Sequence, residues 1–307
     1  MKHYSVMLNE TIQGLNIKDD GVYVDATLGY AGHSKEILKR IKKGKLFAFD
    51  ADSEAINYSH QLLKSISSNF KIIHSNFMYL SEKLDEESVG LVDGFLFDLG
   101  LSSPEIDDAD RGFSFMKDAP LDMRMDRAGS FTATTIVNNY KEEDLLKLFY
   151  EYAEEPRSKD IVKEIISYRK NKEITHTLEL VEIIKRGVGA NYFYKHHPER
   201  VIFQALRIEV NGELKAIEKA LPDAIKRLNK GGRICVITFH SLEDRIVKKI
   251  FKKYSEVDEI FKGMPDIPEK YRPLIKLINK KPITPSEEEL SENSRSKSAK
   301  LRIVERI

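Results

Sequence analysis

Small residues and a carboxylate stand where a nucleotide-like ligand binds in many α/β proteins. The run GVYVDAT at residues 21–27 leads into LGYAGHS, which places Gly29, Ala31 and Gly32 in one short loop. Small side chains let a ligand approach the backbone closely. Asp50 follows 18 residues after Gly32, where an acid can accept hydrogen bonds from both ribose hydroxyls of a nucleoside. The spacing is not Gly-x-Gly-x-x-Gly, so pyrophosphate binding has little support. An ordinary tight turn would explain Gly32 alone, but loop and acid together favour a ligand.

A second carboxylate, Asp98, ends the run DGFLFDLG and is followed by small residues. It stands where a transferred group would meet its acceptor, although a helix cap or a turn would use the same residue. His33 and His240 occupy similar loop positions, and lone histidines are more often structural. The sequence contains no His-x-x-x-His pair with a nearby acid, no P-loop and no Gly-x-Ser-x-Gly elbow. It therefore predicts no metal site.

These residues need a parallel sheet to bring them together. Strands are predicted at GVYVDAT (21–27), KLFAFD (45–50), KIIHSNF (71–77), DGFLFDLG (93–100) and GGRICVITF (231–239). The segments between the first four strands have helical periodicity, and Ser34 is expected to cap the first helix. Strands that alternate with helices indicate a parallel sheet with right-handed crossovers. KPITP (281–285) and KLRIVERI (300–307) are expected to be the last, edge strands, and residues 255–280 a loop.

A helical segment interrupts this pattern. DLLKLFYEYAEEP, SKDIVKEIISYRK and TLELVEIIKRG predict amphipathic helices, and residues 204–228 predict one long helix. The expected fold class is α/β: a doubly wound Rossmann-like sheet interrupted by an inserted all-helical domain. Residues 1–110 and 205–307 are expected to form the sheet domain, and residues 111–204 the insertion.

Composition limits the setting and the partners. The 307 residues carry 50 Lys and Arg against 49 Asp and Glu, but residues 206–307 hold 23 basic and 16 acidic side chains. A basic third allows a polyanionic partner, although a charge run is more often a solvated face. No apolar stretch approaches the roughly 20 residues that span a bilayer, and the N-terminus lacks a secretory apolar region. The single Cys235 excludes an internal disulfide framework. We therefore expect a cytoplasmic protein without a membrane partner.

Several long strings resemble one known family, the bacterial small-subunit ribosomal RNA cytidine N4-methyltransferases (RsmH, also called MraW). They are HYSVMLNETIQGLNIKDDGVYVDATLGYAGHS (3–34), DLGLSSPEIDDADRGFSFMKDAPLDMRMD (98–126), FQALRIEVNGEL (203–214), GGRICVITFHSLEDRIVK (231–248) and SRSKSAKLRIVE (294–305). They occur in the family's order over nearly the whole chain. The string DxxRGFSF followed by PLDMRMD is highly specific.

This resemblance implies S-adenosylmethionine as methyl donor and 16S ribosomal RNA of the small subunit as substrate. The target would be the exocyclic N4 of a decoding-region cytidine, and the sheet domain would be a methyltransferase domain with a substrate-recognition insertion. The residues that match the family's donor pocket are Ala31, Gly32 and His33 in the loop, Asp50 at the ribose hydroxyls, Phe77 beside the adenine, and Asp98 and Glu105 completing it.

Two positions depart from the family's pattern. The family usually reads Gly-Gly-His where this chain has Ala31-Gly32-His33, and Gln where it has Glu105. Ala31 adds one methyl group but remains a small turn residue. Glu105 keeps a hydrogen-bond acceptor, loses the amide donor and adds a charge.

Methyl transfer to a cytosine amine is an in-line displacement at a sulfonium, so positioning is the protein's main task. The amine lone pair is delocalised into the ring, and an acceptor for its N–H bonds helps to localise it. Asp98 is the predicted catalytic residue for this role, although donor binding alone would also explain it. Phe113 or Phe115 would supply a base-stacking face, with a place in the core of the insertion as the alternative.

Candidate RNA contacts are Arg111, Arg124 and Arg127, which could equally pair with Asp122 or Asp126. A basic tail adds Arg295, Lys297, Lys300 and Arg302. Two other functions compete with methyl transfer: a nicotinamide-dependent oxidoreductase, and a ribosome-assembly factor that binds RNA without catalysis. The broken glycine fingerprint counts against the first, and the intact Gly32, Asp50 and Asp98 count against the second. The sequence leaves a homodimer open.

Overall fold

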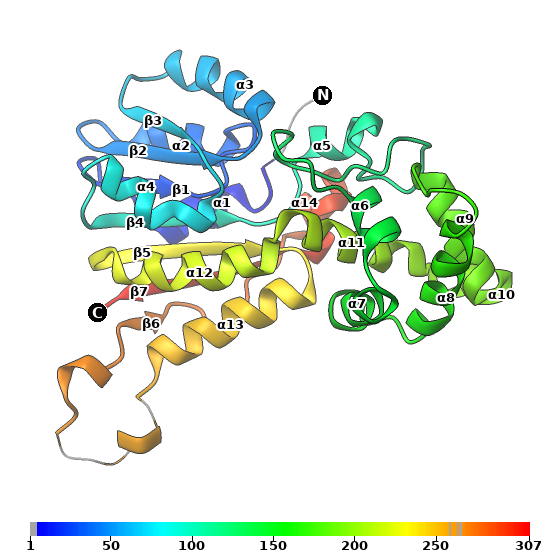
Figure 1. Cartoon of the computed structure of the whole chain (residues 1–307). Helices are drawn as coiled ribbons and strands as arrows, with labels where there is room; N and C mark the ends of the chain where they lie inside the picture. Colours follow the sequence, from blue (N-terminus) through cyan, green and yellow to red (C-terminus); the bar gives the residue numbers. More distant parts are fainter. Residues whose placement is uncertain (1–4, 258, 262, 264–265) are drawn as a thin grey trace. The chain divides into compact units, whose positions relative to one another are not determined.

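The computed structural model describes residues 5–257, 259–261, 263 and 266–307. The chain forms two compact units: unit 1 is Met1–Gly100 with Leu214–Ile307, and unit 2 is Leu101–Glu213 (Figure 1). The sequence analysis placed these boundaries at residues 110 and 205. It also predicted one long helix over residues 204–228, and that prediction is wrong. Gly212, with a φ of 61°, ends helix α11 (Pro198–Asn211) before α12 (Glu213–Lys226) begins. A positive φ favours glycine and stops the helix.

Unit 1 is built on a seven-stranded sheet in the order β3-β2-β1-β4-β5-β7-β6. The strands are β1 (Val22–Asp25), β2 (Lys45–Asp50), β3 (Phe70–His74), β4 (Val92–Asp98), β5 (Leu228–Thr238), β6 (Ile275–Leu277) and β7 (Lys300–Arg306). The first five are parallel, β7 is antiparallel to β5, and β6 is antiparallel to β7. The strand order reverses at β1, between β2 and β4. Open α/β sheets bind ligands beside such a switch, at the carboxyl ends of the strands.

Helices cover both faces of this sheet. Apolar side chains of α1 (Leu8–Leu15), α2 (Gly32–Arg40) and α3 (Ser53–Lys64) form one buried cluster with side chains of β1, β2, β4, β5 and β7. Neighbouring side chains of a strand point to opposite faces. Ile303 of β7 therefore joins that cluster, whereas Arg302 pairs with Asp244 of α13 (Ser241–Ser255) on the other face. The sheet is doubly wound, which confirms the predicted fold class. Unit 1 also contains α4 (Leu80–Glu86), α14 (Glu287–Glu292) and the 3₁₀ turns η1 (Phe77–Tyr79), η4 (Glu259–Phe261), η5 (Glu269–Tyr271) and η6 (Ser294–Ser298).

Unit 2 is helical and has its own core. Its elements are α5 (Ser103–Asp107), η2 (Ala109–Arg111), α6 (Ala133–Asn139), α7 (Glu142–Leu148), a π-helical turn η3 (Phe149–Ala153), α8 (Ser158–Arg169), α9 (Thr177–Val188), α10 (Ala190–His196) and α11. Phe149, Ile161, Ile184 and Leu206 are among its fully buried side chains. The three predicted amphipathic helices correspond to α7 with η3, α8 and α9.

The edge of the sheet differs from the prediction. KPITP is not a strand: Ile283 makes only an isolated bridge to Leu301. Pro282 and Pro285 explain this, because proline has no N–H to donate to a strand ladder. The edge strand is β6, which lies in the stretch expected to be a loop and buries Ile275 completely.

Candidate functional site

Three carboxylates end three neighbouring strands of unit 1. Asp25 ends β1, Asp50 ends β2 and Asp98 ends β4. These strands are adjacent and parallel, so the three acids meet at the carboxyl edge of the sheet. The sequence analysis singled out Asp50 and Asp98 but missed Asp25, although the run VYVDAT offers the same signal, an acid that ends a buried strand.

Hydrogen bonds hold the loop after β1 against the neighbouring strand ends. The backbone N–H of Asp98 donates to the hydroxyl of Thr27 at 2.7 Å, and the N–H of Gly29 donates to Oδ2 of Asp50 at 2.7 Å. The hydroxyl of Ser59 in α3 donates to the carbonyl of Gly29 at 2.7 Å. The loop is thus held from β4, from β2 and from α3, which gives a ligand a preorganised backbone surface.

The small residues of the loop have distinct structural roles. Ala31 is fully buried with a φ of 60°, a conformation that glycine adopts more easily. A side chain on Gly32 would collide with the hydroxyl of Ser5. A Cβ on Gly29 would meet no atom of the described residues within 4 Å. The loop therefore packs against the protein at Gly32 and faces open space at Gly29, as a ligand-binding turn requires.

Burial makes two of the carboxylates reluctant to ionise. Asp25 accepts hydrogen bonds from the Ser34 hydroxyl at 2.7 Å and the Thr27 N–H at 3.1 Å. Loss of water around it nevertheless raises its pKa to about 6. The pKa of Asp50 is also raised to about 6, chiefly by burial. Ser34 is therefore not the helix cap that the sequence predicted: α2 begins at Gly32, and Ser34 binds Asp25 from its first turn.

Asp98 is the most perturbed of the three acids. Burial raises the pKa of Asp98 well above its usual range, and the negative charges of Asp25, Glu243 and Glu289 add to this shift. Its Oδ1 atom is buried and has no hydrogen-bond partner among the described residues. Its Oδ2 atom lies 3.5 Å from Nδ1 of His33.

The second nitrogen of His33 fixes its tautomer. Nε2 lies 3.1 Å from the backbone carbonyl of Val6, which can only accept, so Nε2 carries a proton. A neutral imidazole in this tautomer presents Nδ1 as an acceptor, and a proton on Asp98 then lies between Oδ2 and Nδ1. Oδ1 remains an acceptor whichever of the two groups holds that proton, and it is the unsatisfied atom of the site.

Phe77 stands beside this edge as well. It begins η1 just after β3, and its ring packs edge-on against Phe97 with centroids 5.8 Å apart. The N–H of Ser75 donates to the Asp50 carbonyl at 2.9 Å, which joins this segment to the end of β2. Phe77 is half-buried, so one side of its ring is available to a flat ligand.

Glu105 belongs to unit 2. It lies in α5, and its carboxylate accepts hydrogen bonds from the N–H and the hydroxyl of Ser102 at 2.8 and 2.7 Å. Ser102 and Glu105 form a capping box. This structural role needs an acceptor only, so the acidic residue at a position where the family usually has Gln is compatible with the fold. A donor contact by Glu105 stays a prediction.

One family model, described as the MraW methylase family, matches residues 1–307, the whole chain. The chain belongs to the MraW methylase family. This confirms the resemblance found in the sequence, and with it a methyltransferase whose methyl donor is S-adenosylmethionine. It also makes the oxidoreductase and the non-catalytic factor the weaker alternatives.

Solved structures of similar proteins include a protein assigned as an rRNA-methylase from Clostridium thermocellum, with 12% identity and a TM-score of 0.46 over 99% of each chain. An rRNA methylase from Streptococcus thermophilus has 13% identity and a TM-score of 0.43, over 100% of this chain and 99% of that one. A protein assigned as a methyltransferase from Streptococcus mutans, in complex with SAH, has 11% identity and a TM-score of 0.44 over 99% of each chain. These likenesses are too distant to locate a site.

The carboxyl edge of an MraW methylase would have to hold a ribose diol and a positively charged sulfur, and these residues fit both. Asp50 uses each carboxylate oxygen once, for the N–H groups of Gly29 and Asp52, and each oxygen keeps a second lone pair for a hydroxyl. Three acids with pKa values raised by burial and mutual repulsion favour a cation. The orphaned Oδ1 of Asp98 supplies an acceptor.

Several predicted RNA contacts are structural instead. Arg111 is only 3% exposed and donates to the carbonyls of Arg124 and Met125, both at 3.0 Å, so it cannot reach a phosphate. Arg124 pairs with Asp122 through two hydrogen bonds of 2.7 and 2.6 Å, as the alternative held. A phosphate contact by Arg127 stays a prediction.

The basic tail is divided in the same way. Arg302 pairs with Asp244 through two hydrogen bonds of 2.7 and 3.1 Å, and Lys300 lies 3.7 Å from the same carboxylate. Arg295 and Lys297 are exposed. RNA contacts of the tail therefore fall first to these two residues, because Arg302 would have to give up a charged partner.

The aromatic candidates for base stacking belong to the core of unit 2. Phe113 is 9% exposed within its apolar cluster, and Phe115 packs edge-on against Phe203 at 5.7 Å. Phe239, which follows β5 at the carboxyl edge of unit 1, is half-buried. A Cβ on Gly100 would lie 3.2 Å from its ring. The sequence analysis missed Phe239, which the strand-end rule would have found.

Proposed function

We propose that this protein transfers a methyl group from S-adenosylmethionine to the exocyclic N4 of a decoding-region cytidine in 16S ribosomal RNA of the small subunit. The observation that carries the proposal is the orphaned Oδ1 of Asp98 at the carboxyl edge of the sheet. In a methylase of this family, an unsatisfied acceptor beside the donor loop is suited to an N–H group of the substrate.

When bound, S-adenosylmethionine supplies a methyl carbon activated by a positively charged sulfur. Asp98 Oδ1 accepts an N–H bond of the cytosine amine, which directs the nitrogen lone pair toward that carbon. A bond forms between nitrogen and carbon, the carbon–sulfur bond breaks, and the nitrogen loses one proton. The raised pKa of Asp98 makes its carboxylate a better acceptor for that proton. The aromatic face of Phe239 is the candidate platform for the cytosine ring.

The wider parts of the proposal concern the two units. Unit 1 binds the methyl donor through Ala31, Gly32, His33, Asp50, Phe77 and Asp98. Unit 2, with its separate helical core, is the substrate-recognition part. The target base has to leave its stack to reach the donor, and RNA is then held through phosphates and 2′-hydroxyls.

The test is methyl transfer with labelled donor to isolated small subunits and to deproteinised 16S RNA. We expect label in ribosomal RNA from at least one of these substrates, recovered as a methylated cytidine. Label in protein only, or in no macromolecule, would overturn the proposed substrate. Calorimetry with S-adenosylmethionine and with NAD on the same sample shows separately whether the donor site works.

A further inference from the structure

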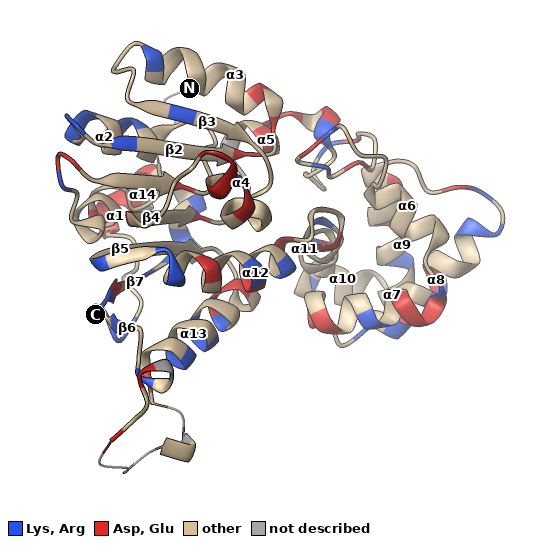
Figure 2. Ribbon diagram, turned by 60° about the vertical axis from the view of Figure 1, so that its left-hand side comes forward, with Lys and Arg blue, Asp and Glu red and all other residues tan. Residues whose placement is uncertain are grey.

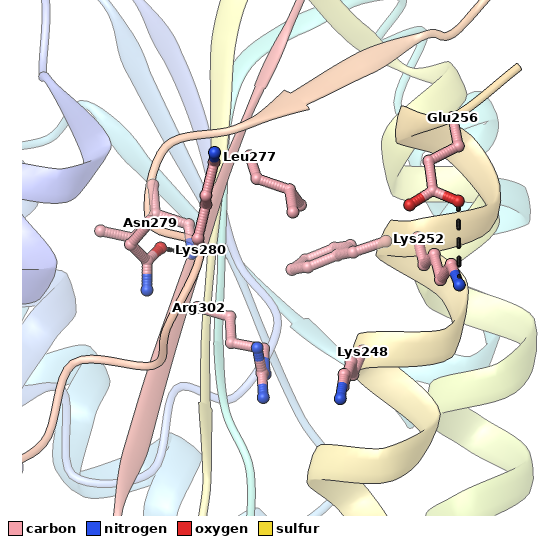
Figure 3. A pocket seen from close by; sticks show the side chains of 9 residues that line it. Lys248, Lys252, Glu256, Leu277, Asn279, Lys280 and Arg302 are labelled. Carbon is pink, nitrogen blue, oxygen red and sulfur yellow. Dashed lines mark hydrogen bonds and ion pairs between the residues drawn. The ribbon is translucent and has the colours of Figure 1, made fainter.

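A pocket of about 160 Å³ opens on unit 1 between helix α13 and the antiparallel edge of the sheet (Figure 3). Figure 3 shows Lys248 and Lys252 on α13, with Leu277, Lys280 and Arg302 on the facing segments. Nothing in the donor site uses these side chains. The pocket is thus a separate feature of the same unit.

The pocket carries uncompensated positive charge. Arg302 is neutralised by Asp244 through two hydrogen bonds, and Lys252 lies 3.9 Å from Glu256. Within the described part of the chain, the amino groups of Lys248 and Lys280 have neither an ion pair nor a hydrogen bond, and both residues are exposed. Figure 2 shows Lys and Arg recurring along α13. Lys248 and Lys280 therefore face the pocket from two sides as available cations.

Apolar side chains lie beside these charges. Phe251 is 2% exposed and Leu277 is 42% exposed, and both line the pocket. A volume of about 160 Å³ is below the roughly 300–1,000 Å³ of pockets that enclose a whole small molecule. The space suits one part of a longer ligand. Cations for phosphate and an apolar surface for a base are the two elements of single-stranded nucleic-acid sites.

The pocket is continuous with the donor edge along β7. Lys300 is paired in register with Thr238, at the carboxyl end of β5, and Arg302 is paired with Val236, two residues further from that edge. β6, which carries Leu277, pairs with the far half of β7. A chain that enters the donor edge beside Lys300 can therefore run along β7 into the pocket.

We propose that this pocket binds one nucleotide of the RNA substrate away from the target cytidine. Lys248 and Lys280 contact its phosphate, and Leu277 contacts its base. The inference rests on the proposed RNA substrate and adds a second holding point within unit 1, separate from the basic tail and from unit 2.

The experiment is a salt titration of binding to a short single-stranded RNA of mixed sequence, followed by fluorescence anisotropy. Each phosphate contact to a single strand contributes about 0.7 to the log–log slope. The double variant Lys248→Ala/Lys280→Ala should therefore have a slope shallower than wild type by about 1.4. Leu277→Ala should weaken binding with the slope unchanged.

The matched control is Lys249→Ala/Lys281→Ala. These lysines are exposed neighbours of the pocket lysines and do not line the pocket, so the net charge changes equally. The control should keep most of the wild-type slope. Equal slopes in the two double variants would overturn the proposal, because only overall charge would then matter.

Two further arms separate other outcomes. Inorganic phosphate, tested by thermal shift, should stabilise wild type no more than the pocket variant; a pocket-dependent shift without any effect on RNA would mean an anion site and overturn the proposal. Calorimetry with S-adenosylmethionine should give equal affinity for all variants. If wild type methylates ribosomal RNA while the pocket variant binds RNA like the control, the pocket proposal fails and the proposed function stands. If the pocket effect appears without cytidine methylation, the reverse holds.

Discussion

Asp50 links three parts of the donor edge through its two carboxylate oxygens. One accepts from the loop at Gly29, and the other from Asp52, whose side chain caps α3. Replacing Asp50 with Ala removes the acceptor for the ribose hydroxyls, and hydrogen bonds to a charged acceptor contribute about 1.5–3 kcal/mol. Donor affinity should fall by roughly ten- to a hundredfold in calorimetry. Asp50→Asn, which keeps one oxygen acceptor, should lose less. Unchanged affinity in the Ala variant would remove Asp50 from the site.

The raised pKa of Asp50 predicts a pH dependence of donor binding. Its pKa is about 6 in the free protein, and the ionised carboxylate is the better partner for hydroxyls and for a cation. Donor affinity should be constant well above pH 6 and should fall as pH drops through about 6, by up to about tenfold per unit for one linked proton. Calorimetry from pH 5 to pH 8 measures this. A flat profile would show that binding does not depend on this ionisation, and the Asp50→Asn profile should be flatter than that of wild type.

Among the elements, the RGFSF loop illustrates how one buried cation can organise a segment. Arg111 holds the backbone at Arg124 and Met125 and lies 3.8 Å from Glu105. Breaking such a buried charge network costs about 3–5 kcal/mol. Arg111→Ala should therefore reduce the free energy of unfolding by about that amount in urea denaturation.

Lys117→Ala is the control for this prediction, because Lys117 is an exposed lysine of the same unit and its loss should change stability by less than about 0.5 kcal/mol. If Arg111→Ala kept full stability and lost RNA affinity instead, the residue would be an RNA contact after all.

The elements also show how far sequence reasoning reaches. The five parallel strands were predictable because each is a short apolar run bounded by turn residues, and their alternation with helices fixed the parallel sheet. Asp50 and Asp98 followed from their strand-end positions. The sequence could not show that Arg111 and Arg302 are paired, because their partners depend on tertiary packing. It also missed β6, whose three residues carry too little periodicity to be recognised.

For the whole molecule, the division into two units predicts a division of labour. Replacing residues 102–212 with a short flexible linker should leave a folded unit 1 that binds S-adenosylmethionine with nearly unchanged affinity, because the three acids and their loop all lie within it. The same variant should no longer methylate ribosomal RNA. Circular dichroism and calorimetry establish the fold and the donor site first. Retained methylation would show that unit 2 does not shape the substrate site.

In the part of the chain that the structure describes, no helix is both long and apolar enough to cross a membrane. The surplus of basic side chains in residues 206–307, 23 against 16 acidic ones, lies mainly in unit 1. The acids of the donor edge belong to the same unit. Unit 1 thus combines a site suited to a cationic donor with surfaces suited to a polyanionic substrate.

The most direct test of the account is the identity of the methylated nucleoside after a single turnover on small-subunit RNA, determined by mass spectrometry for wild type and for Asp98→Asn. We predict N4-methylcytidine from wild type. Asp98→Asn should give the same nucleoside at a rate reduced by roughly a hundredfold or more, measured with donor at saturating concentration. A product methylated at another atom, or an Asp98→Asn rate equal to that of wild type under saturation, would contradict the assignment of Asp98 as the acceptor for the cytosine amine.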